Sequence, residues 1–271
     1  MKSIIRTAVV LALSAVVPVA AHAHKAWLLP SSTVLSGTDD LAVTIDAAAS
    51  NDLFYFDHRP LQLDSLVVTA PDGSKVAAEN ASTGKYRSTF DVPLKAPGTY
   101  RVALVMDNLF ATYKDGGKEK RWRGKKENIA KEIPASATDL VVTQSTRRLE
   151  TFVTAGAPDE AALKPIGAGL ELEPVTHPND LVEKSEAEFK LLLDGKPAPG
   201  VKIEIVRGGI RYRNQLGDAT VTTDANGVFK YTWPEPGMYW LEASVEDDKA
   251  TVEGAKQRRA GYAVTLEVLP E

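Results

Sequence analysis

The 271-residue chain contains no cysteine, which excludes disulfide bridges, thiolate metal sites and cysteine nucleophiles. Its net charge is only −4, so the bulk charge indicates neither nucleic acid nor an anionic membrane surface as a partner. The sequence also lacks the serine-hydrolase elbow, the phosphate loop, the dinucleotide fingerprint and the HExxH zinc motif. These absences argue against an enzyme and favour a binding protein.

Long apolar runs are equally scarce, and the one that stands out is at the N-terminus. Lys2 and Arg6 precede the apolar residues 8–16, which are too few to span a bilayer comfortably. Ala21 and Ala23 then supply the small residues that a signal peptidase recognises. We therefore predict a signal peptide over residues 1–23, cleavage after Ala23, export to the periplasm, and no transmembrane segment in the mature chain.

The remainder of the chain alternates between β-branched or period-2 runs and turn signals such as Pro-Asp-Gly and Ala-Pro-Gly. The expected strands include residues 41–45, 65–69, 99–105, 139–143, 187–193, 201–206, 220–223, 228–233, 238–243 and 262–268. This pattern predicts an all-β fold of two tandem β-sandwiches. We expect an N-terminal sandwich over residues 24–155, a linker over 156–168 and a C-terminal sandwich over 169–271.

Two segments look like one element used twice. "LKAPGTYRVALV" and "PEPGMYWLEASV" each place a Pro-Gly turn before a strand that opens near a tyrosine. Between them, the Gly-, Pro- and Ala-rich residues 155–169 have little period-2 pattern, and a short helix is expected at Asp159–Leu163. The aromatic cluster Tyr231, Trp233, Tyr239 and Trp240 could form a carbohydrate platform, but such side chains are more typical of a sandwich core.

Histidine is rare, with only four in the chain. Cleavage after Ala23 would remove His22 and make His24 the N-terminal residue of the mature protein. An N-terminal histidine offers its α-amine and its Nδ1 atom to one ion, and the amine loses its proton at a pKa of about 7.7–8.0 in model peptides. Nitrogen ligands of this kind suit Cu(II), Ni(II) or Zn(II). The alternative is that cleavage happens to leave a histidine at a frayed terminus.

The other two histidines lie in irregular segments. His58 follows Asp57, which could orient it, and His177 is bracketed by Pro174 and Pro178. Each of them alone is equally typical of an ordinary loop. If all three converge, they form a three-imidazole site that a carboxylate would complete, and that site would lie at the interface between the two sandwiches. The carboxylates nearest to His177 in the sequence are Glu173 and Asp180.

The stretch "KDGGKEKRWRGKK", Lys114–Lys126, is strongly basic and contains Trp122. It could contact an acidic partner, or bind an anionic ligand such as a metal chelate on which Trp122 stacks. The simpler interpretation is a solvated hairpin between strands. Nucleic acid is an unlikely ligand for it because the whole chain is acidic and carries an export signal.

Several segments together resemble the NikM-like exported proteins: "AHKAWLLPS", "STRRLETFVTAGAP", "GLELEPVTHPNDL" and "FKLLLDGKPAPGVKIEI" with "TTDANGVFKYTWPEPGMYWLEAS". That family is labelled as the periplasmic component of ABC-type cobalt/nickel transport. Its last segment also occurs in carboxypeptidase-regulatory-like and immunoglobulin-like β modules. The resemblance implies an exported protein that handles metal rather than an enzyme, and its motifs map to His24 and His177. Without a membrane segment, the chain would reach an inner- or outer-membrane metal transporter by diffusion.

Three hypotheses follow from these residues. The first is a periplasmic protein that binds a divalent transition metal (nickel, cobalt, copper or zinc) through His24, His58 and His177, with Glu173 or Asp180. The second is a copper oxygenase that uses an N-terminal histidine brace, with Tyr55 or Phe56 as the aromatic neighbour. The third is a non-metal module that binds polysaccharide or protein, with the sandwich edges or the basic stretch as its contact surface.

Overall fold

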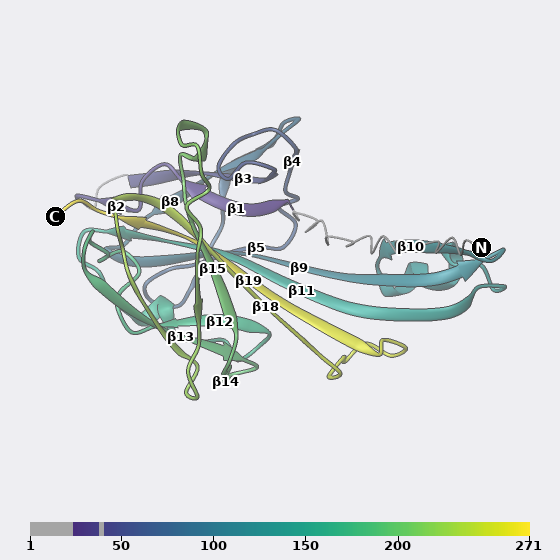
Figure 1. The fold of residues 1–271 in the computed structure, drawn as a ribbon. Helices are drawn as coiled ribbons and strands as arrows, with labels where there is room; N and C mark the ends of the chain where they lie inside the picture. The colour runs from purple at the N-terminus through teal and green to yellow at the C-terminus, as the bar shows by residue number, and fades with distance from the viewer. Residues whose placement is uncertain (1–23, 38–40) are drawn as a thin grey trace, which may run out of the picture.

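The computed structural model describes residues 24–37 and 41–271, so the expected signal peptide lies outside the described residues. These residues form three β-sheets with only short helical turns, which confirms the predicted all-β sandwich class (Figure 1). Among the described residues, no helix has the length and apolarity needed to cross a membrane.

Sheet A covers the N-terminal half in the order β1-β3-β8-β7, and β4 pairs with β3. Its strands are β1 (Lys25–Pro30), β3 (Leu41–Ser50), β4 (Arg59–Pro60), β7 (Glu79–Thr83) and β8 (Ser88–Leu94). β8 alternates strictly between buried and half-buried residues, as expected for a strand with one face on a core.

Sheet B has ten strands and runs through both halves in the order β16-β15-β18-β19-β11-β9-β5-β6. β2 pairs with β11 and β10 pairs with β9. Its strands are β2 (Val34–Leu35), β5 (Leu66–Thr69), β6 (Lys75–Val76), β9 (Gly98–Asp115), β10 (Lys118–Gly124), β11 (Thr138–Ala155), β15 (Lys202–Arg207), β16 (Ala219–Thr222), β18 (Gly237–Asp247) and β19 (Gln257–Val268). The halves join where β11 pairs in parallel with β19, from Thr143 opposite Gln257 to Thr151 opposite Thr265.

Sheet C covers the C-terminal half of sheet B. It consists of β12 (Leu170–Pro174), β13 (Glu186–Leu193), β14 (Lys196–Pro197) and β17 (Val228–Thr232). The helical turns are η1 (Lys126–Asn128), α1 (Ile129–Glu132), η2 (Ala161–Leu163) and η3 (Ile210–Tyr212). η2 lies where the short helix was expected, in the segment 156–168 that connects β11 to sheet C.

Each half has its own apolar core, one between sheets A and B and the other between sheets C and B. Trp240 on β18 belongs to the N-terminal core although it lies in the C-terminal half, and its indole Nε1–H donates to the carbonyl of Ala26 (3.0 Å). Trp233 and Tyr239 are also fully buried, as expected for core aromatics rather than a carbohydrate platform. The two sandwiches are therefore fused through a common sheet and a shared tryptophan.

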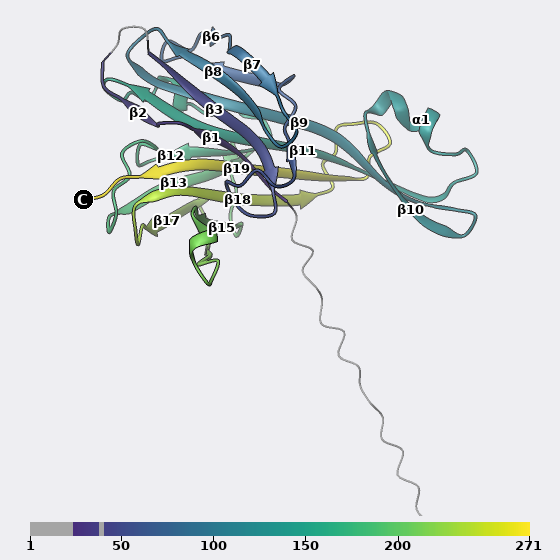
Figure 2. The same cartoon turned by 90° about the horizontal axis from the view of Figure 1, so that it is seen from above.

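β9 and β11 are the longest strands, and they extend past both cores as an arm that also contains β10 and α1 (Figure 2). The basic stretch 114–126 forms the end of β9, a Gly116-Gly117 turn, and β10. It is thus a hairpin, as its simpler interpretation expected. The arm has a small core of its own around Leu109, Ala111, Tyr113, Ile133 and Val142.

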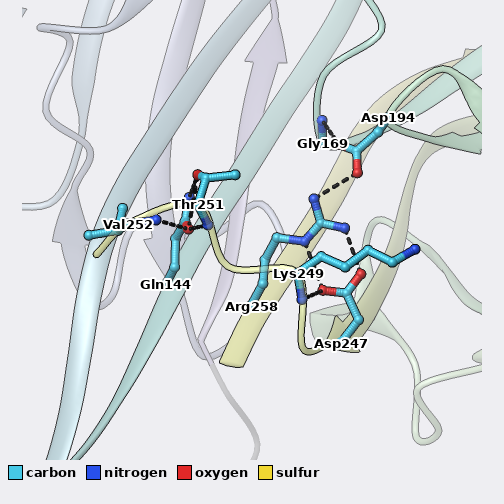
Figure 3. Close-up of polar contacts among 8 residues, drawn as sticks. All are labelled: Gln144, Gly169, Asp194, Asp247, Lys249, Thr251, Val252 and Arg258. Carbon is cyan, nitrogen blue, oxygen red and sulfur yellow. Dashed lines mark hydrogen bonds and ion pairs between the residues drawn. The ribbon is translucent and has the colours of Figure 1, made fainter. Parts of the chain in front are cut away.

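A polar cluster braces the base of the arm against the loop between β18 and β19 (Figure 3). The side-chain oxygen of Gln144 on β11 accepts hydrogen bonds from the backbone N–H groups of Thr251 (2.7 Å) and Val252 (3.1 Å). Nearby, Arg258 pairs with Asp247 and with Asp194 of the turn after β13. The hydrogen bonds from Arg258 hold the pKa of Asp247 below its usual value, and this cluster links sheet C to sheet B.

Candidate functional site

His24 and His58 lie side by side at one end of sheet A. β3 is flanked by β1 on one side, where Lys25 lies opposite Ser50, and by β4 on the other, where Arg59 lies opposite Ala49. His24 and His58 each precede those strands by one residue, so they meet across the end of β3. Their imidazole rings stack with centroids 3.6 Å apart and planes within 5°.

Aromatic side chains hold the loop that carries His58. Leu53 is fully buried, and the rings of Phe54 and Phe56 each pack against Trp27 at a centroid distance of 5.5 Å. Phe54 has a left-handed φ of 62°, which reverses the chain so that these apolar residues point inward. The carboxylate of Asp57 accepts the backbone N–H of Asn51 (3.0 Å) and so closes the loop. Asp57 was expected to orient His58, but its carboxylate binds the backbone of Asn51 instead.

Lys25 fixes the start of β1 to the C-terminal half. Its ammonium group lies 2.7 Å from a carboxylate oxygen of Glu204 on β15 and 4.5 Å from the ring centroid of Trp240. Because the Lys25 side chain is only 11% exposed, this contact is shielded from solvent. His24 is thus positioned at the junction of the two halves, by contacts to both of them.

The stacked rings have the spacing, but not yet the orientation, of two ligands on one ion. Two nitrogens that bind one ion at about 2.0–2.1 Å lie roughly 3–4 Å apart, which is close to the separation of these rings. The lone pairs of parallel rings point in parallel directions, so at least one ring has to rotate for both to reach the same ion. Both histidines are exposed, and rotation about χ2 is open to them.

His177 is held elsewhere, in a network of hydrogen bonds. Its Nδ1 accepts the backbone N–H of Asn179 (3.1 Å), so Nε2 carries the ring proton and faces Thr99 Oγ1 (3.0 Å) and the carbonyl of Asp159 (3.1 Å). Both ring nitrogens are therefore occupied. His177 connects sheet C, the 156–168 segment and the start of β9, which is a structural task.

His177 and the stacked pair lie near opposite ends of β1. Asn179 donates to the carbonyl of Thr33 (2.6 Å), beyond the far end of β1, whereas His24 precedes its first residue. Six residues of strand at about 3.3 Å each place roughly 20 Å between these two ends. The structure therefore brings together His24 and His58 of the three predicted ligands, and leaves His177 apart.

The two carboxylates predicted to complete the site stay with His177. Glu173 on β12 pairs with Lys190 of the neighbouring β13 (3.2 Å). Asp180 is exposed in the turn that follows His177, to whose carbonyl its backbone N–H donates. Within residues 24–37 and 41–271, no three His, Asp or Glu side chains gather closely enough to hold a metal ion. The two imidazoles supply two nitrogen ligands, and a four-coordinate ion would also need the α-amine of His24 and a ligand from outside the protein.

The aromatic residues considered for a histidine brace face other partners. Tyr55 lies against the guanidinium of Arg211 (5.2 Å), and burial together with Tyr212 raises its pKa above the usual value. Phe56 lies between Trp27 and the guanidinium of Arg87, which is 4.3 Å from its ring centroid. Neither ring is stacked on the histidine pair.

A groove of about 650 Å³ begins at His24 and follows sheet B along the base of the arm. Its cationic lining includes Arg59, Arg123 and Arg147. In the sequence, Arg123 stood out only as part of the basic stretch 114–126. The signal that was missed lies in the period-2 alternation of β11, whose sheet-A-facing positions change from apolar at Leu149 to polar at Arg147, Ser145 and Thr143.

Comparison with known proteins gives a family but no activity. A search of curated proteins found no significant match. Among solved structures, the D0-D1 domain of Intimin is similar at 15% sequence identity and a TM-score of 0.23, over 89% of this chain and 97% of that one. The model of a family described as a domain of unknown function, DUF4198, matches residues 21–247, a range that includes the histidine pair and three of the groove-lining arginines, Arg59, Arg123 and Arg147. The chain belongs to the DUF4198 family.

Proposed function

We propose that this is an exported, periplasmic protein that binds one divalent transition-metal ion through His24 and His58. Cleavage after Ala23 would give His24 a free α-amine, so that one residue contributes two nitrogens and His58 contributes a third. Exogenous ligands or water would complete the coordination. The single observation that supports this proposal most strongly is the stacking of the first residue after the predicted cleavage site on His58, at 3.6 Å.

The donor set narrows the choice of metal. Imidazole and amine nitrogens suit nickel, copper, zinc and cobalt. Calcium and magnesium prefer oxygen ligands, and the part of the chain that the structure describes gathers no cluster of carboxylates around the histidine pair. The resemblance to NikM-like proteins supports nickel or cobalt and a role as an accessory to a metal transporter. The mature protein would then carry or present the ion in the periplasm.

Calorimetric titration of the mature protein, which begins at His24, with Ni(II), Co(II), Cu(II) and Zn(II) tests this proposal. We expect one equivalent to bind. His24→Ala and His58→Ala should each lower the affinity for the tightest-bound metal by about tenfold or more, because each removes a ligand. Acetylation of the N-terminal amine should have a similar effect, since the resulting amide nitrogen no longer offers a lone pair to the ion.

His177→Ala is the matched control, because it removes an imidazole from the same protein outside the pair. Its metal affinity should equal that of the wild type. Equal binding by wild type, His24→Ala and His58→Ala would refute the proposal, and so would mass spectrometry that finds the processed N-terminus away from His24.

The copper-oxygenase hypothesis needs a separate measurement, because a two-histidine site is also the core of a histidine brace. Tyr55 and Phe56 pack against other partners, and this arrangement favours binding over catalysis. We expect the copper-loaded protein to form no more hydrogen peroxide with a reductant than His58→Ala does. Formation that depends on His58 would make oxygen chemistry the better description.

A further inference from the structure

The groove beside the histidine pair arises because sheet B is longer than sheet A. Where sheet A covers sheet B, the side of β9 that faces sheet A is apolar and carries Tyr100, Val102 and Leu104. Beyond the end of sheet A, the same face continues with Met106, Asn108 and Phe110, which line the groove. β11 changes in the same way, from buried Leu149 to Arg147, Ser145 and Thr143. An open platform of mixed polar and apolar side chains is thus left beside His24 and Arg59, which also line the groove.

Most of the acidic side chains in the groove are already neutralised. Glu204 pairs with Lys25 (2.7 Å), Glu242 with Arg147, and Glu246 with Arg259 (3.6 Å). Asp218 is the only other carboxylate among the described residues that line the groove.

More cationic than acidic side chains in the groove are without an ion-pair partner among the described residues. Arg59, Arg123 and Lys202 line the groove and have no carboxylate partner within ion-pair distance among the described residues. The groove therefore presents an excess of positive charge, concentrated in two guanidinium groups near His24.

The arginines are close enough to act on one another. Partial burial, with Arg123 and Arg147 nearby, lowers the pKa of Arg59 from its usual value, although Arg59 remains a cation at any physiological pH. Like charges held close together cost free energy, and an anion bound in the groove would offset that cost.

We propose that the groove binds a small organic anion with two or more carboxylate groups, held by Arg59 and Arg123. Guanidinium groups bind carboxylates through two parallel hydrogen bonds, and two guanidiniums that line one groove without carboxylate partners favour an anion with two such groups. The volume suits an organic molecule rather than a lone inorganic ion. Met106, Phe110 and Leu61 provide apolar contact for its carbon skeleton.

This site does not depend on the metal proposal, and its test uses protein freed of metal on a chelating resin. Calorimetric titration with citrate should show saturable binding, at least about tenfold tighter than acetate, which can engage only one guanidinium. Inorganic phosphate should show no saturable binding. Arg59→Gln and Arg123→Gln should each weaken citrate binding by about tenfold or more. Arg123→Lys should fall in between, because it keeps the charge but loses the planar fork.

Arg121→Gln is the matched control. Arg121 is two residues from Arg123 on β10, so it faces the same way, is exposed, and lies outside the groove. This variant should bind citrate like the wild type, and circular dichroism should show all variants folded. The proposal is overturned if citrate does not bind, if phosphate binds as tightly as citrate, or if Arg121→Gln and Arg123→Gln lose the same affinity.

Discussion

The two halves of the molecule enter their long central strands through the same local structure. Gly98 and Gly237, the first residues of β9 and β18, have nearly equal φ angles, 125° and 133°. Two residues later, Tyr100 and Tyr239 are buried, and each hydroxyl donates back to the carbonyl four residues upstream, at 3.0 Å and 2.7 Å. This is a tyrosine corner, a feature of immunoglobulin-like sandwiches, and here it is used twice.

The corners differ in what holds them. At the N-terminal corner, the carboxylate of Asp159 accepts the backbone N–H of Thr99 (2.9 Å), and His177 reaches the Thr99 hydroxyl. Both of these partners come from beyond β11. At the C-terminal corner, Arg207 of neighbouring β15 donates to the carbonyl of Pro236 (3.0 Å). The first corner is thus part of the joint between the halves, whereas the second is braced within its own sheet.

The strands that leave the corners also differ. β18 ends after 11 residues, but β9 continues for 18 and builds both the arm and the groove. The start of β1, which His24 directly precedes, lies at the end of sheet A that faces this extension (Figure 1). The comparison indicates that the C-terminal sandwich supplies a platform, and that the candidate site belongs to the N-terminal sandwich.

The largest predicted effect distinguishes the corners through their glycines. A Cβ atom at Gly98 would lie 1.9 Å from Asp159 Oδ2 and 2.6 Å from the Cβ of Pro71, whereas one at Gly237 would meet only Arg207 Nε at 3.4 Å. Gly98→Ala should therefore lower the free energy of unfolding by roughly 3–4 kcal/mol, and Gly237→Ala, which carries backbone strain alone, by about 1–2 kcal/mol. Urea denaturation measures both.

A double variant separates strain from crowding at Gly98. Adding Asp159→Ala to Gly98→Ala removes the nearest clash, so the double variant should lose less than the sum of the two single losses. Strict additivity, or equal losses for Gly98→Ala and Gly237→Ala, would show that the two corners are mechanically equivalent.

Local pattern was sufficient for most strands. Period-2 runs placed β13 and β15 within one residue of their observed bounds, and the repeated Pro-Gly-x-Tyr segment marked both corners. β9 and β11 were expected to be much shorter, at residues 99–105 and 139–143. On their groove-facing side the outer parts carry a mixture of polar and apolar residues, because that side meets solvent instead of sheet A, and the opposite side packs into the small core of the arm.

The sharing of one sheet by both halves had no local signal. It depends on the parallel pairing of β11 with β19, which lie more than 100 residues apart in the sequence. Such a register is set by tertiary contacts, which neither composition nor periodicity encodes.

For the candidate site too, local sequence features predicted one part, and tertiary contacts determined the rest. The proximity of His24 and His58 follows from strand pairing at the end of β3, and their rarity in the chain directed attention to them. His177 had equal standing in the sequence, but the donors and acceptors around it use both ring nitrogens. Residue type and rarity nominate ligands, and only the partners of each nitrogen separate a ligand from a structural histidine.

The second prediction follows from that division. His177→Ala should lower the free energy of unfolding by about 1–3 kcal/mol, because it leaves the Asn179 N–H and the Asp159 carbonyl without their partner in the joint. His58→Ala removes an exposed side chain, so its urea midpoint should match that of the wild type in the absence of metal. Added Ni(II) or Cu(II) should raise the thermal midpoint of His177→Ala by more than that of His58→Ala, because the latter binds the ion more weakly. The reverse pattern would assign the site to His177.

The smallest predicted effect concerns the two tyrosine hydroxyls. Tyr100 both donates to the carbonyl of Ala96 (3.0 Å) and accepts its N–H (2.9 Å), whereas Tyr239 makes a single hydrogen bond to Glu235. Tyr100→Phe leaves two backbone groups without a partner and should cost about 1–2 kcal/mol, and Tyr239→Phe about 1 kcal/mol or less. Equal values would mean that water reaches Ala96 once the hydroxyl is gone. A larger loss at Tyr239 would reverse the order of the corners, and the C-terminal turn would then be the more tightly held of the two.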